Sequence, residues 1–317
     1  MKSIIRLIPA MGMSILASTV FADNKAAPVA SDGSFVNVLE SASISNAKTL
    51  GYNGNIKLNA ADTGADITPL TSEKVKQLNK LDDPKNTKIE SVLGSDSRFK
   101  VDPYESNSNN YQKLSRNTVF ISFVNNNQAK MCTGWLISKD TVATAGHCVH
   151  GGGSTGKWNS SATVYPAYGA TNSSVAPFGS CAARRFYSVG GWTGSGNSDY
   201  DYGAIKLNCS IGNTVGWYGF QNRSTVNGLP AIIYGYPGDK PTRDPWITAD
   251  VVRSSTAKRL VYLNDTYGGM SGSPIFYDDG VGRYVIGIHT NGGGSNNSGV
   301  RIDKSVFDNL VAWGKAL

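Results

Sequence analysis

Glutamate is nearly absent from the larger part of this chain, which has 317 residues in total. Residues 91–317 contain 13 aspartates but a single glutamate, Glu105. Roughly a dozen glutamates would be ordinary in a globular segment of this length. The same segment carries 20 lysines and arginines. It therefore offers almost no peptide bond that follows a glutamate and many that follow a basic residue.

Long apolar runs and dense basic runs are missing as well. Beyond the N-terminus no stretch is long and apolar enough for a transmembrane helix, so we expect no later membrane span. The 30 basic and 23 acidic side chains give a net charge of +7, but the basic residues are scattered and no nucleic-acid motif accompanies them. We interpret the charge as a source of solubility and of a bias toward acidic partners, and we expect no nucleic-acid partner.

The first 22 residues have the pattern of a secretory signal peptide. Lys2 and Arg6 form a basic start, and residues 7–20 are mostly apolar but short for a bilayer span. Val20 and Ala22 stand at the positions that signal peptidase reads. We expect cleavage after Ala22, export to an extracellular location and no membrane attachment afterwards. A membrane anchor is the less favoured alternative because of the length of this segment.

Residues 23–90 differ in composition from the residues that follow. They are rich in Ala, Ser, Asn, Lys and Asp, and Phe35 and Tyr52 are their only aromatic residues. A segment with so few large apolar side chains cannot bury much surface by itself. We therefore expect no self-contained apolar core within it.

Only four cysteines are present, and four cysteines allow three pairings. Export implies an oxidising compartment, in which disulfides form. If Cys132 pairs with Cys148, the bridge closes a loop of about 16 residues that carries His147, worth about 3 kcal/mol in the chain-entropy description. Cys181 and Cys209 would then form the second bridge. A zinc site at Cys132, His147 and Cys148 is disfavoured because no CxxC spacing is present, so we expect no metal and no cofactor and leave structural calcium open.

Short apolar runs separated by Gly, Asn, Ser and Pro dominate the chain after about residue 110. Such runs are typical of β-strands, and their number indicates an all-β barrel or sandwich. One helix is predicted near the C-terminus, because Asp303 can cap it and the apolar residues that follow recur at helical spacing. The clearest predicted strands are 118–124, 134–137, 141–143, 203–207, 231–234, 274–277 and 283–288, and the apolar face of the helix comprises Val306, Phe307, Leu310, Val311 and Trp313.

Three polar residues, far apart in the sequence, have the settings of a catalytic triad. His147 follows a predicted strand, Asp201 opens another, and Ser271 lies in a glycine-rich turn. A serine hydroxyl is a poor nucleophile near neutral pH unless an imidazole takes its proton and a buried carboxylate orients that imidazole. The turn before Ser271 also allows the amides of Gly269 and Ser271 to converge on an oxyanion, and losing one such donor typically costs about 3 kcal/mol.

These motifs resemble those of the chymotrypsin-like serine proteases. Thr144-Ala145-Gly146-His147-Cys148 is similar to their histidine motif, Gly269-Met270-Ser271-Gly272-Ser273-Pro274 is similar to their nucleophile motif, and the order His, Asp, Ser along the chain is the same. The likeness is greatest to the bacterial glutamyl endopeptidases of the staphylococcal (V8) and Bacillus type, and it covers most of residues 91–317. The stretches that carry it are 91–96, 186–189, 201–207, 212–219 and 287–293.

The resemblance implies a fold of two six-stranded antiparallel β-barrels with a C-terminal α-helix. It implies a first barrel over residues 91–218, which carries the histidine and the aspartate, and a second barrel with the helix over residues 219–317. Residues 23–90 would be a propeptide that is removed at the Glu90–Ser91 bond, while a second trimming site at Glu105 is left open. The implied protein is a secreted, monomeric serine endopeptidase, made as a zymogen, whose partners are polypeptide substrates and its own propeptide.

Two interpretations of the substrate specificity compete. Asp265 lies six residues before Ser271, where trypsin-like enzymes carry the acid that selects lysine or arginine. His289 lies 18 residues after Ser271 and, with Thr266, matches residues that bind the substrate carboxylate in the glutamyl endopeptidases. By the same resemblance, the freed α-amino group of Ser91 adds positive charge to this P1 pocket. The scarcity of glutamate favours cleavage after Glu, and less well after Asp, over trypsin-like cleavage.

Other assignments of the same residues remain open at this point. Ser273 is the rival nucleophile, Asp199 is best interpreted as a solvated loop acid, and His150 is expected to be an exposed loop residue before three glycines. A catalytically inactive relative that serves as a binding module is a third functional hypothesis, although no member of the triad is missing.

Overall fold

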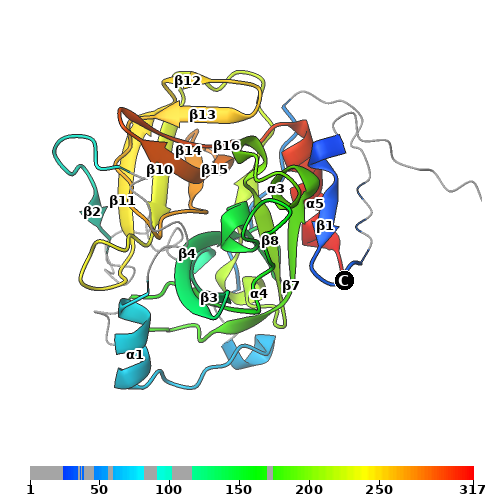
Figure 1. Cartoon of the computed structure of the whole chain (residues 1–317). Helices are drawn as coiled ribbons and strands as arrows, with labels where there is room; N and C mark the ends of the chain where they lie inside the picture. Colours follow the sequence, from blue (N-terminus) through cyan, green and yellow to red (C-terminus); the bar gives the residue numbers. More distant parts are fainter. Residues whose placement is uncertain are drawn as a thin grey trace, which may run out of the picture.

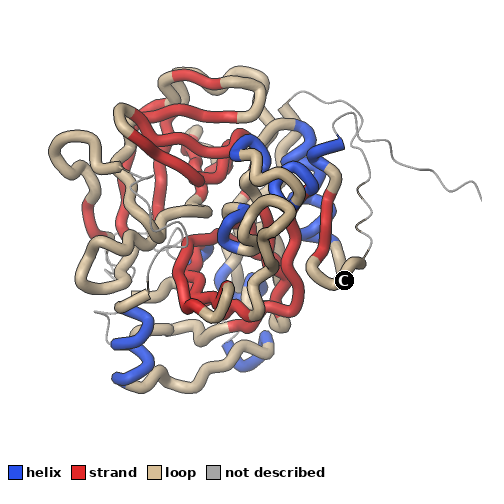
Figure 2. The backbone as a smooth tube through the Cα atoms, in the orientation of Figure 1, coloured by secondary structure: helices blue, strands red, loops and turns tan. Residues whose placement is uncertain are grey.

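The computed structural model describes residues 24–34, 36, 38, 46–55, 60–81, 91–101, 116–169 and 174–317. Two β-sheets make up most of this structure, and the C-terminal helix packs beside them (Figure 1; Figure 2). The predicted all-β fold with a C-terminal helix is therefore confirmed. The expected signal peptide over residues 1–22 lies outside the described residues, as do Glu90 and Glu105.

The first sheet closes into a barrel. Its strands pair in the order β1-β7-β6-β3-β4-β5-β8, and β7 also pairs with β8, so six strands form a closed antiparallel barrel to which β1 adds a seventh. A two-residue turn joins β3 to β4, where Asn126 and Asn127 have φ angles of 49° and 61°, a left-handed conformation that asparagine tolerates. The strands are β1 (Pro28–Ala30), β3 (Thr118–Asn125), β4 (Gln128–Leu136), β5 (Thr141–Thr144), β6 (Ser161–Pro166), β7 (Cys181–Val189) and β8 (Gly203–Leu207).

The second sheet curls into a half-barrel. Its order is β12-β13-β16-β15-β14-β10-β11-β2, with β9 on β15, and among the described residues no pairing joins its two ends. The expectation places residues 91–101 in the first barrel, but their strand β2 pairs with β11 of the second sheet. The strands are β2 (Phe99–Lys100), β9 (Gly219–Phe220), β10 (Pro230–Gly235), β11 (Trp246–Val251), β12 (Ser254–Ser255), β13 (Arg259–Tyr262), β14 (Pro274–Asp278), β15 (Arg283–Gly293) and β16 (Asn296–Arg301).

Helix α5 (Lys304–Lys315) begins where the sequence predicts it. The Asp303 side chain accepts from the Val306 amide at 2.9 Å, which caps the helix. Trp313 is fully buried, and its ring lies 5.8 Å from the rings of Tyr187 and Tyr202 in the first barrel. The shorter helices are η1 (Asn24–Ala26), η2 (Ala60–Thr63), α1 (Ser72–Asn79), η3 (Gly146–Cys148), α3 (Gly190–Thr193), η4 (Ser198–Tyr200) and α4 (Gly212–Val215).

No helix in the described part of the chain has both the length and the apolar character needed to cross a membrane.

The two disulfides have the expected pairing. Cys132 is joined to Cys148, which ties β4 to η3, and Cys181 is joined to Cys209, which ties β7 to the loop after β8. Both bridges therefore stabilise the first barrel. The first of them holds the turn that carries His147 against the strand facing it.

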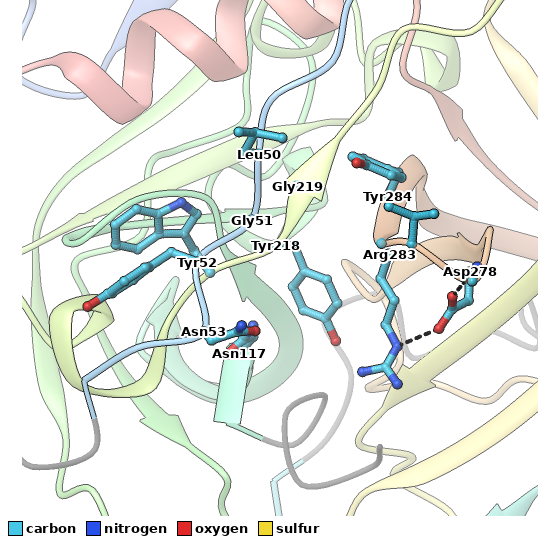
Figure 3. A pocket seen from close by; sticks show the side chains of 14 residues that line it. Leu50, Gly51, Tyr52, Asn53, Asn117, Tyr218, Gly219, Asp278, Arg283 and Tyr284 are labelled. Carbon is cyan, nitrogen blue, oxygen red and sulfur yellow. Dashed lines mark hydrogen bonds and ion pairs between the residues drawn. The ribbon is translucent and has the colours of Figure 1, made fainter. Parts of the chain in front are cut away.

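Residues 208–229 link the two sheets and contain α4 and β9. Residues 46–55 run along this linker, and Figure 3 shows Leu50 to Asn53 passing beside Gly219. Antiparallel bridges pair Lys48 with Gln221 and Tyr52 with Trp217. Other parts of residues 23–90 contribute buried apolar side chains to clusters that also contain residues of the two sheets: Ala26, Ala30, Val36, Val38, Leu78 and Leu81.

Replacing Trp313 by alanine tests the contribution of α5 to stability. We expect Trp313→Ala to lower the free energy of unfolding by about 3–5 kcal/mol, because it removes a fully buried ring and leaves a cavity. Val311→Ala, at a half-buried position of the same helix, should lower it by about 1 kcal/mol. Urea unfolding of both variants, in a Ser271→Ala background that prevents self-digestion, measures the difference. Equal losses would contradict this packing role.

Candidate active site

His147 and Asp201 form a buried pair on the first barrel. His147 lies in η3, immediately after β5, and Asp201 follows η4 and precedes β8. The imidazole Nδ1 is 2.8 Å from Oδ2 and 3.0 Å from Oδ1 of Asp201, and the His147 amide donates to Oδ1 at 2.8 Å. Two donors from one residue therefore fix the carboxylate and the ring together, while Nε2 points away from the pair. This is the arrangement in which an imidazole serves as a proton acceptor.

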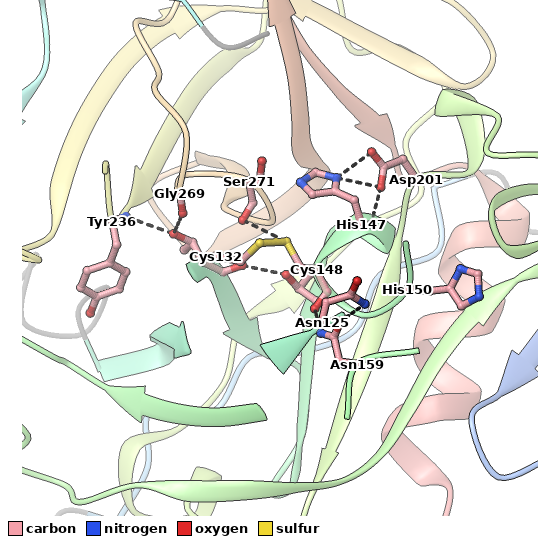
Figure 4. The surroundings of a disulfide bond; sticks show 12 residues. Asn125, Cys132, His147, Cys148, His150, Asn159, Asp201, Tyr236, Gly269 and Ser271 are labelled. Atoms are coloured by element: carbon pink, nitrogen blue, oxygen red, sulfur yellow. Dashed lines mark hydrogen bonds and ion pairs between the residues drawn. A yellow bond between two sulfur atoms is a disulfide. The ribbon is translucent and has the colours of Figure 1, made fainter. Parts of the chain in front are cut away.

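Ser271 meets this pair from the second sheet, in the turn before β14. The Thr133 amide donates to the Ser271 carbonyl at 2.9 Å, which joins the turn to β4. Gly272 has a φ of 87°, and a Cβ there would lie only 2.1 Å from the Thr133 carbonyl oxygen, so the close approach requires glycine. Figure 4 shows Ser271 beside the His147 ring, on the side opposite Asp201. The three predicted residues thus meet at the seam between the sheets.

Thr133 also fixes the backbone before Ser271. Its hydroxyl donates to the Gly269 carbonyl at 2.8 Å and accepts from the Tyr236 amide at 3.0 Å. Gly269 has a φ of 98°, and a Cβ there would lie 2.6 Å from the Tyr236 carbonyl oxygen. The sequence pointed to Gly269 through its conformational freedom. It gave no sign of Thr133, because a threonine inside a strand has no distinctive pattern.

The two alternative residues near the triad lie apart from it. The Asp199 side chain is half-buried in the turn before Asp201, where the Asp199 amide donates to the Asn197 side chain at 3.0 Å. The Ser273 hydroxyl lies over Gly235, only 2.1 Å from where a Cβ of that residue would stand. Neither residue takes part in the contact between His147 and Asp201.

The expectation that His150 is exposed is wrong. Its side chain is 5% exposed, its ring centroid is 4.9 Å from that of Trp158, and its Nδ1 accepts from the Gly152 amide at 3.0 Å. Burial lowers the pKa of His150. The glycine-rich loop was expected to leave the histidine in solvent, but a backbone bridge from His150 to Trp158 folds the loop back over it.

Asp265 faces the segment that begins at Ser91. Its carboxylate accepts from the Leu93 amide at 2.5 Å and from both the amide and the hydroxyl of Ser97 at 2.6 Å. The side chain is 2% exposed. A buried carboxylate that already has three donors is poorly placed to bind a substrate cation. This orientation is the one expected from the glutamyl endopeptidases, and it disagrees with a trypsin-like role.

A buried asparagine that the sequence did not single out holds Ser91 in place. The Asn297 Oδ1 accepts from the Ser91 amide at 3.1 Å, and its Nδ2 donates to the carbonyls of Ser91 and Asn264 at 2.7 and 2.8 Å. The Thr266 amide also donates to the Ser91 carbonyl, at 3.3 Å. Ser91 and Thr266 are thereby neighbours. The Thr266 hydroxyl is buried and has no hydrogen-bond partner among the described residues.

His289 lies on β15 beside the turn that carries Ser271. The Gly272 amide donates to its carbonyl at 2.7 Å, and its own amide donates to the Ser273 carbonyl at 2.9 Å. The Tyr262 hydroxyl is 2.6 Å from the His289 Nδ1. When the phenol donates this bond, the imidazole proton resides on Nε2, from which it can be donated to an anion. Sequence reasoning missed Tyr262, which stands opposite Asn297 in the β13–β16 register.

A hollow of about 240 Å³ borders the imidazole of His147. Its lining consists of Asn125, Asn126, Gln128, Lys130, His147, Gly151 and Trp192.

The sequence profile of the family described as Trypsin matches residues 106–311. The chain belongs to the trypsin family of serine proteases. It is 39% identical to the glutamyl endopeptidase of Bacillus licheniformis over 277 residues, which are 83% of this chain and 82% of that protein. It is 41% identical over 231 residues to a Bacillus subtilis protein named extracellular metalloprotease, covering 70% of this chain and 69% of the relative. A solved glutamyl endopeptidase in complex with MPD is 28% identical and superimposes with a TM-score of 0.60, covering 71% of this serine protease and all of that chain.

The name of the Bacillus subtilis relative raises the question of a metal in this serine protease. Among the described residues, one group has side chains close enough to hold an ion: Cys132, His147 and Cys148. Both sulfurs are joined in a disulfide and offer no thiolate, and Nδ1 of the histidine is engaged by Asp201. These donors do not fit a metal ion.

Arg259, which sequence reasoning also missed, connects the Asp201 loop of the protease to its second sheet. Its Nη1 donates to the Ser198 carbonyl at 2.9 Å and to the Thr290 hydroxyl at 3.1 Å, and its Nη2 donates to the Ser298 hydroxyl at 2.6 Å. Burial lowers the pKa of the guanidinium, and the nearby Asp201 carboxylate partly opposes this shift. The planar fork therefore spans the seam a short distance from the catalytic candidates.

Removing the fork of Arg259 should loosen the seam of the protease. We expect Arg259→Met to lower the free energy of unfolding by about 2 kcal/mol, because a carbonyl and two hydroxyls lose a charged donor. The free energy of unfolding of Arg259→Lys should lie between those of Arg259→Met and the wild type, since an ammonium cannot reproduce the planar fork of a guanidinium. Arg253→Met, which breaks an exposed pair with Asp250, serves as the matched control and should unfold like the wild type. Urea unfolding in the Ser271→Ala background measures all three, and equal effects of the two methionine variants would contradict the role assigned to Arg259.

Proposed function

We propose that this serine protease cleaves polypeptides after glutamate, and less well after aspartate, through Ser271, His147 and Asp201. The orientation of the side chains around Ser91 carries the proposal. The Asp265 carboxylate accepts from three donors of residues 93–97, whereas the buried Thr266 hydroxyl has no hydrogen-bond partner among the described residues. A site that turns its acid away and presents donors suits an anionic side chain.

The chemistry follows from the arrangement at the seam. Ser271 attacks the scissile carbonyl while His147 Nε2 takes its proton, and Asp201 stabilises the imidazolium that forms. The amides of Gly269 and Ser271 stabilise the oxyanion of the tetrahedral intermediate. His147 then returns the proton to the leaving amine, which gives an acyl-enzyme on Ser271. Water, deprotonated by the same imidazole, hydrolyses the ester and restores the serine.

The P1 carboxylate would be held by His289, Thr266 and the N-terminus of the mature chain. The contact of Tyr262 with Nδ1 favours a proton on Nε2 of His289, which can then donate to the substrate. Asn297 already accepts from the backbone nitrogen of Ser91. After the Glu90–Ser91 bond is cut, this nitrogen becomes an α-ammonium group and adds a positive charge beside Thr266. Cleavage of the propeptide thereby completes the specificity site.

We further propose that the chain is exported, that residues 1–22 and 23–90 are removed in turn, and that residues 91–317 are the mature, monomeric enzyme. The relatives named as glutamyl endopeptidases support this specificity, and the extracellular relative supports export. Met270 stands where chymotrypsin has an acid that pairs with the new N-terminus. The contact of Ser91 with Asn297 supplies a different route by which the terminus can reach the site.

The P1 profile of the processed protein tests the specificity. On matched peptides with Glu, Asp, Lys or Phe at P1, we expect kcat/KM to be highest for Glu. His289→Ala should lower the Glu to Phe ratio by about 100-fold, because it removes a donor to a desolvated carboxylate. Asp265→Asn is the matched control, and its rank order of P1 residues should equal that of the wild type. Preferred cleavage after Lys, abolished in Asp265→Asn, would show trypsin-like specificity instead.

Self-processing provides an independent test. We expect Glu90→Gln to slow release of the N-terminus at Ser91 at least about tenfold, because the P1 carboxylate is lost. Glu73→Gln, which changes a glutamate in α1 of the same segment, should be processed at the wild-type rate. N-terminal sequencing of the secreted protein over time measures both. A normal Ser91 terminus in Glu90→Gln would mean that another protease, or another specificity, matures the chain.

A further inference from the structure

Residues 46–55, here called the strap, add an edge to the linker between the two sheets. The amides of Tyr52 and Trp217 each donate to the carbonyl of the other residue at 2.9 Å, which is an antiparallel pair of bonds. The Thr49 amide donates to the Phe220 carbonyl at 2.9 Å, and the Phe220 amide donates back to the Thr49 hydroxyl at 3.0 Å. The strap is thus bound mainly through its backbone, in the manner of an added β-strand.

Glycines on both sides allow the strap and the linker to approach closely. A Cβ at Gly54 would lie 2.1 Å from the Thr214 carbonyl oxygen, and a Cβ at Gly51 would lie 2.8 Å from the Gly219 amide. From the linker, a Cβ at Gly216 would lie 2.1 Å from the Tyr52 carbonyl oxygen. The contact therefore depends on small residues in two segments that are far apart in the sequence.

Side chains extend this contact over a wider surface. The ring of Tyr52 lies 4.6 Å from that of Trp217, and the Lys48 ammonium lies 4.9 Å from the centre of the Tyr284 ring. Asn46 accepts from the amide and hydroxyl of Ser224 at 3.1 and 3.2 Å. Beside the strap a hollow of about 440 Å³ is lined by strap and linker residues and by the β14–β15 turn (Figure 3).

This surface shares no residue with the seam that holds Ser271. The described contacts of the strap fall on residues 213–224 and on Tyr284, and no strap residue lines the hollow beside His147. Cutting the chain between Glu90 and Ser91 breaks none of these contacts. Two further attachments of the same segment also do not involve that bond: β1 on β7, and the bond from Asn309 to the Ala26 carbonyl at 2.9 Å.

We propose that the strap docks on the linker as an exosite, and that this docking retains the cleaved pro-segment on an enzyme whose active site is open. The proposal rests on the proposed cleavage of the Glu90–Ser91 bond, after which residues 23–90 stay bound. The strap contacts the linker that connects the two sheets, and none of its described contacts involves Ser271 or the hollow beside His147. The pro-segment is then a bound accessory strand of the mature enzyme rather than a plug in its cleft.

The test cleaves the chain without relying on its own activity. Residues 84–90 of the full chain are replaced by the recognition sequence of an unrelated site-specific protease, in a Ser271→Ala background. After complete cleavage, size-exclusion chromatography should show fragment 23–90 eluting with fragment 91–317. Separation of the wild-type fragments would overturn the proposal, whereas failure of the native chain to process itself would contradict only the proposed function.

Two glycines of the pro-segment make a matched pair for this experiment. Gly54 and Gly64 have φ angles of 78° and 79°, but a Cβ at Gly64 would meet nothing within 4 Å. Both alanine variants carry the same backbone strain, and only Gly54→Ala collides with the linker. We expect Gly54→Ala to speed dissociation of the cleaved fragment at least about tenfold, and Gly64→Ala to stay within about twofold of the wild type. Equal rates for the two variants would overturn the assignment of the strap.

The open active site is tested with Ser271 intact. The cleaved complex, still holding its fragment, should react with a serine-directed phosphonate as fast as enzyme from which the fragment has been removed. If the phosphonate reacts with Ser271 only after the fragment is released, the pro-segment blocks the cleft and the exosite proposal is wrong.

Discussion

The approach of the two sheets at Gly272 is the constraint on which the whole site depends. A Cβ at this position would lie 2.1 Å from the Thr133 carbonyl and 2.2 Å from the Thr144 hydroxyl. A side chain would therefore push the turn that carries Ser271 away from the histidine. Catalysis by positioned groups loses about 100-fold for a displacement near 1 Å. The disulfide between Cys132 and Cys148 and the bond from Thr133 to the Ser271 carbonyl hold the first barrel in the matching position.

Asp265 stands where trypsin-like enzymes carry the acid that selects lysine or arginine, but in this protein its carboxylate contacts residues 93–97. A free carboxylate near the P1 site would repel an anionic substrate by several kcal/mol at low effective dielectric. Here three donors from Leu93 and Ser97 satisfy that carboxylate and, in return, fasten the segment that begins at Ser91. The same interaction directs the carboxylate toward residues 93–97 and brings a future ammonium group toward Thr266. Under the proposed specificity, both effects favour glutamate.

The sequence predicted elements whose signal is local and missed partners whose role exists only in three dimensions. Alternating apolar runs and an N-cap at Asp303 predicted strands and helix α5 closely, because periodicity and capping act within a few residues. Thr133, Asn297 and Arg259 were missed, since each is an ordinary strand residue until distant backbone groups surround it. His150 was misjudged for the same reason: its burial comes from a loop that folds back. The second sheet also acquired β2 from a segment that precedes the first barrel, a pairing without any local signature.

The distribution of glutamate connects specificity with the fate of the pro-segment. Three of the four glutamates in the chain, Glu40, Glu73 and Glu90, lie before Ser91. Under the proposed specificity, cleavage after Glu40 and Glu73 would separate the strap from β1 on one side and from most of α1 on the other. Fragments bound through one attachment dissociate far faster than a segment bound through several, because the effective concentration from the linkage is lost. The enzyme would thus cut its own accessory strand while cutting little within residues 91–317. The lifetime of the bound strap would then depend on the rate of cleavage after Glu40 and Glu73 rather than on the strength of its contacts.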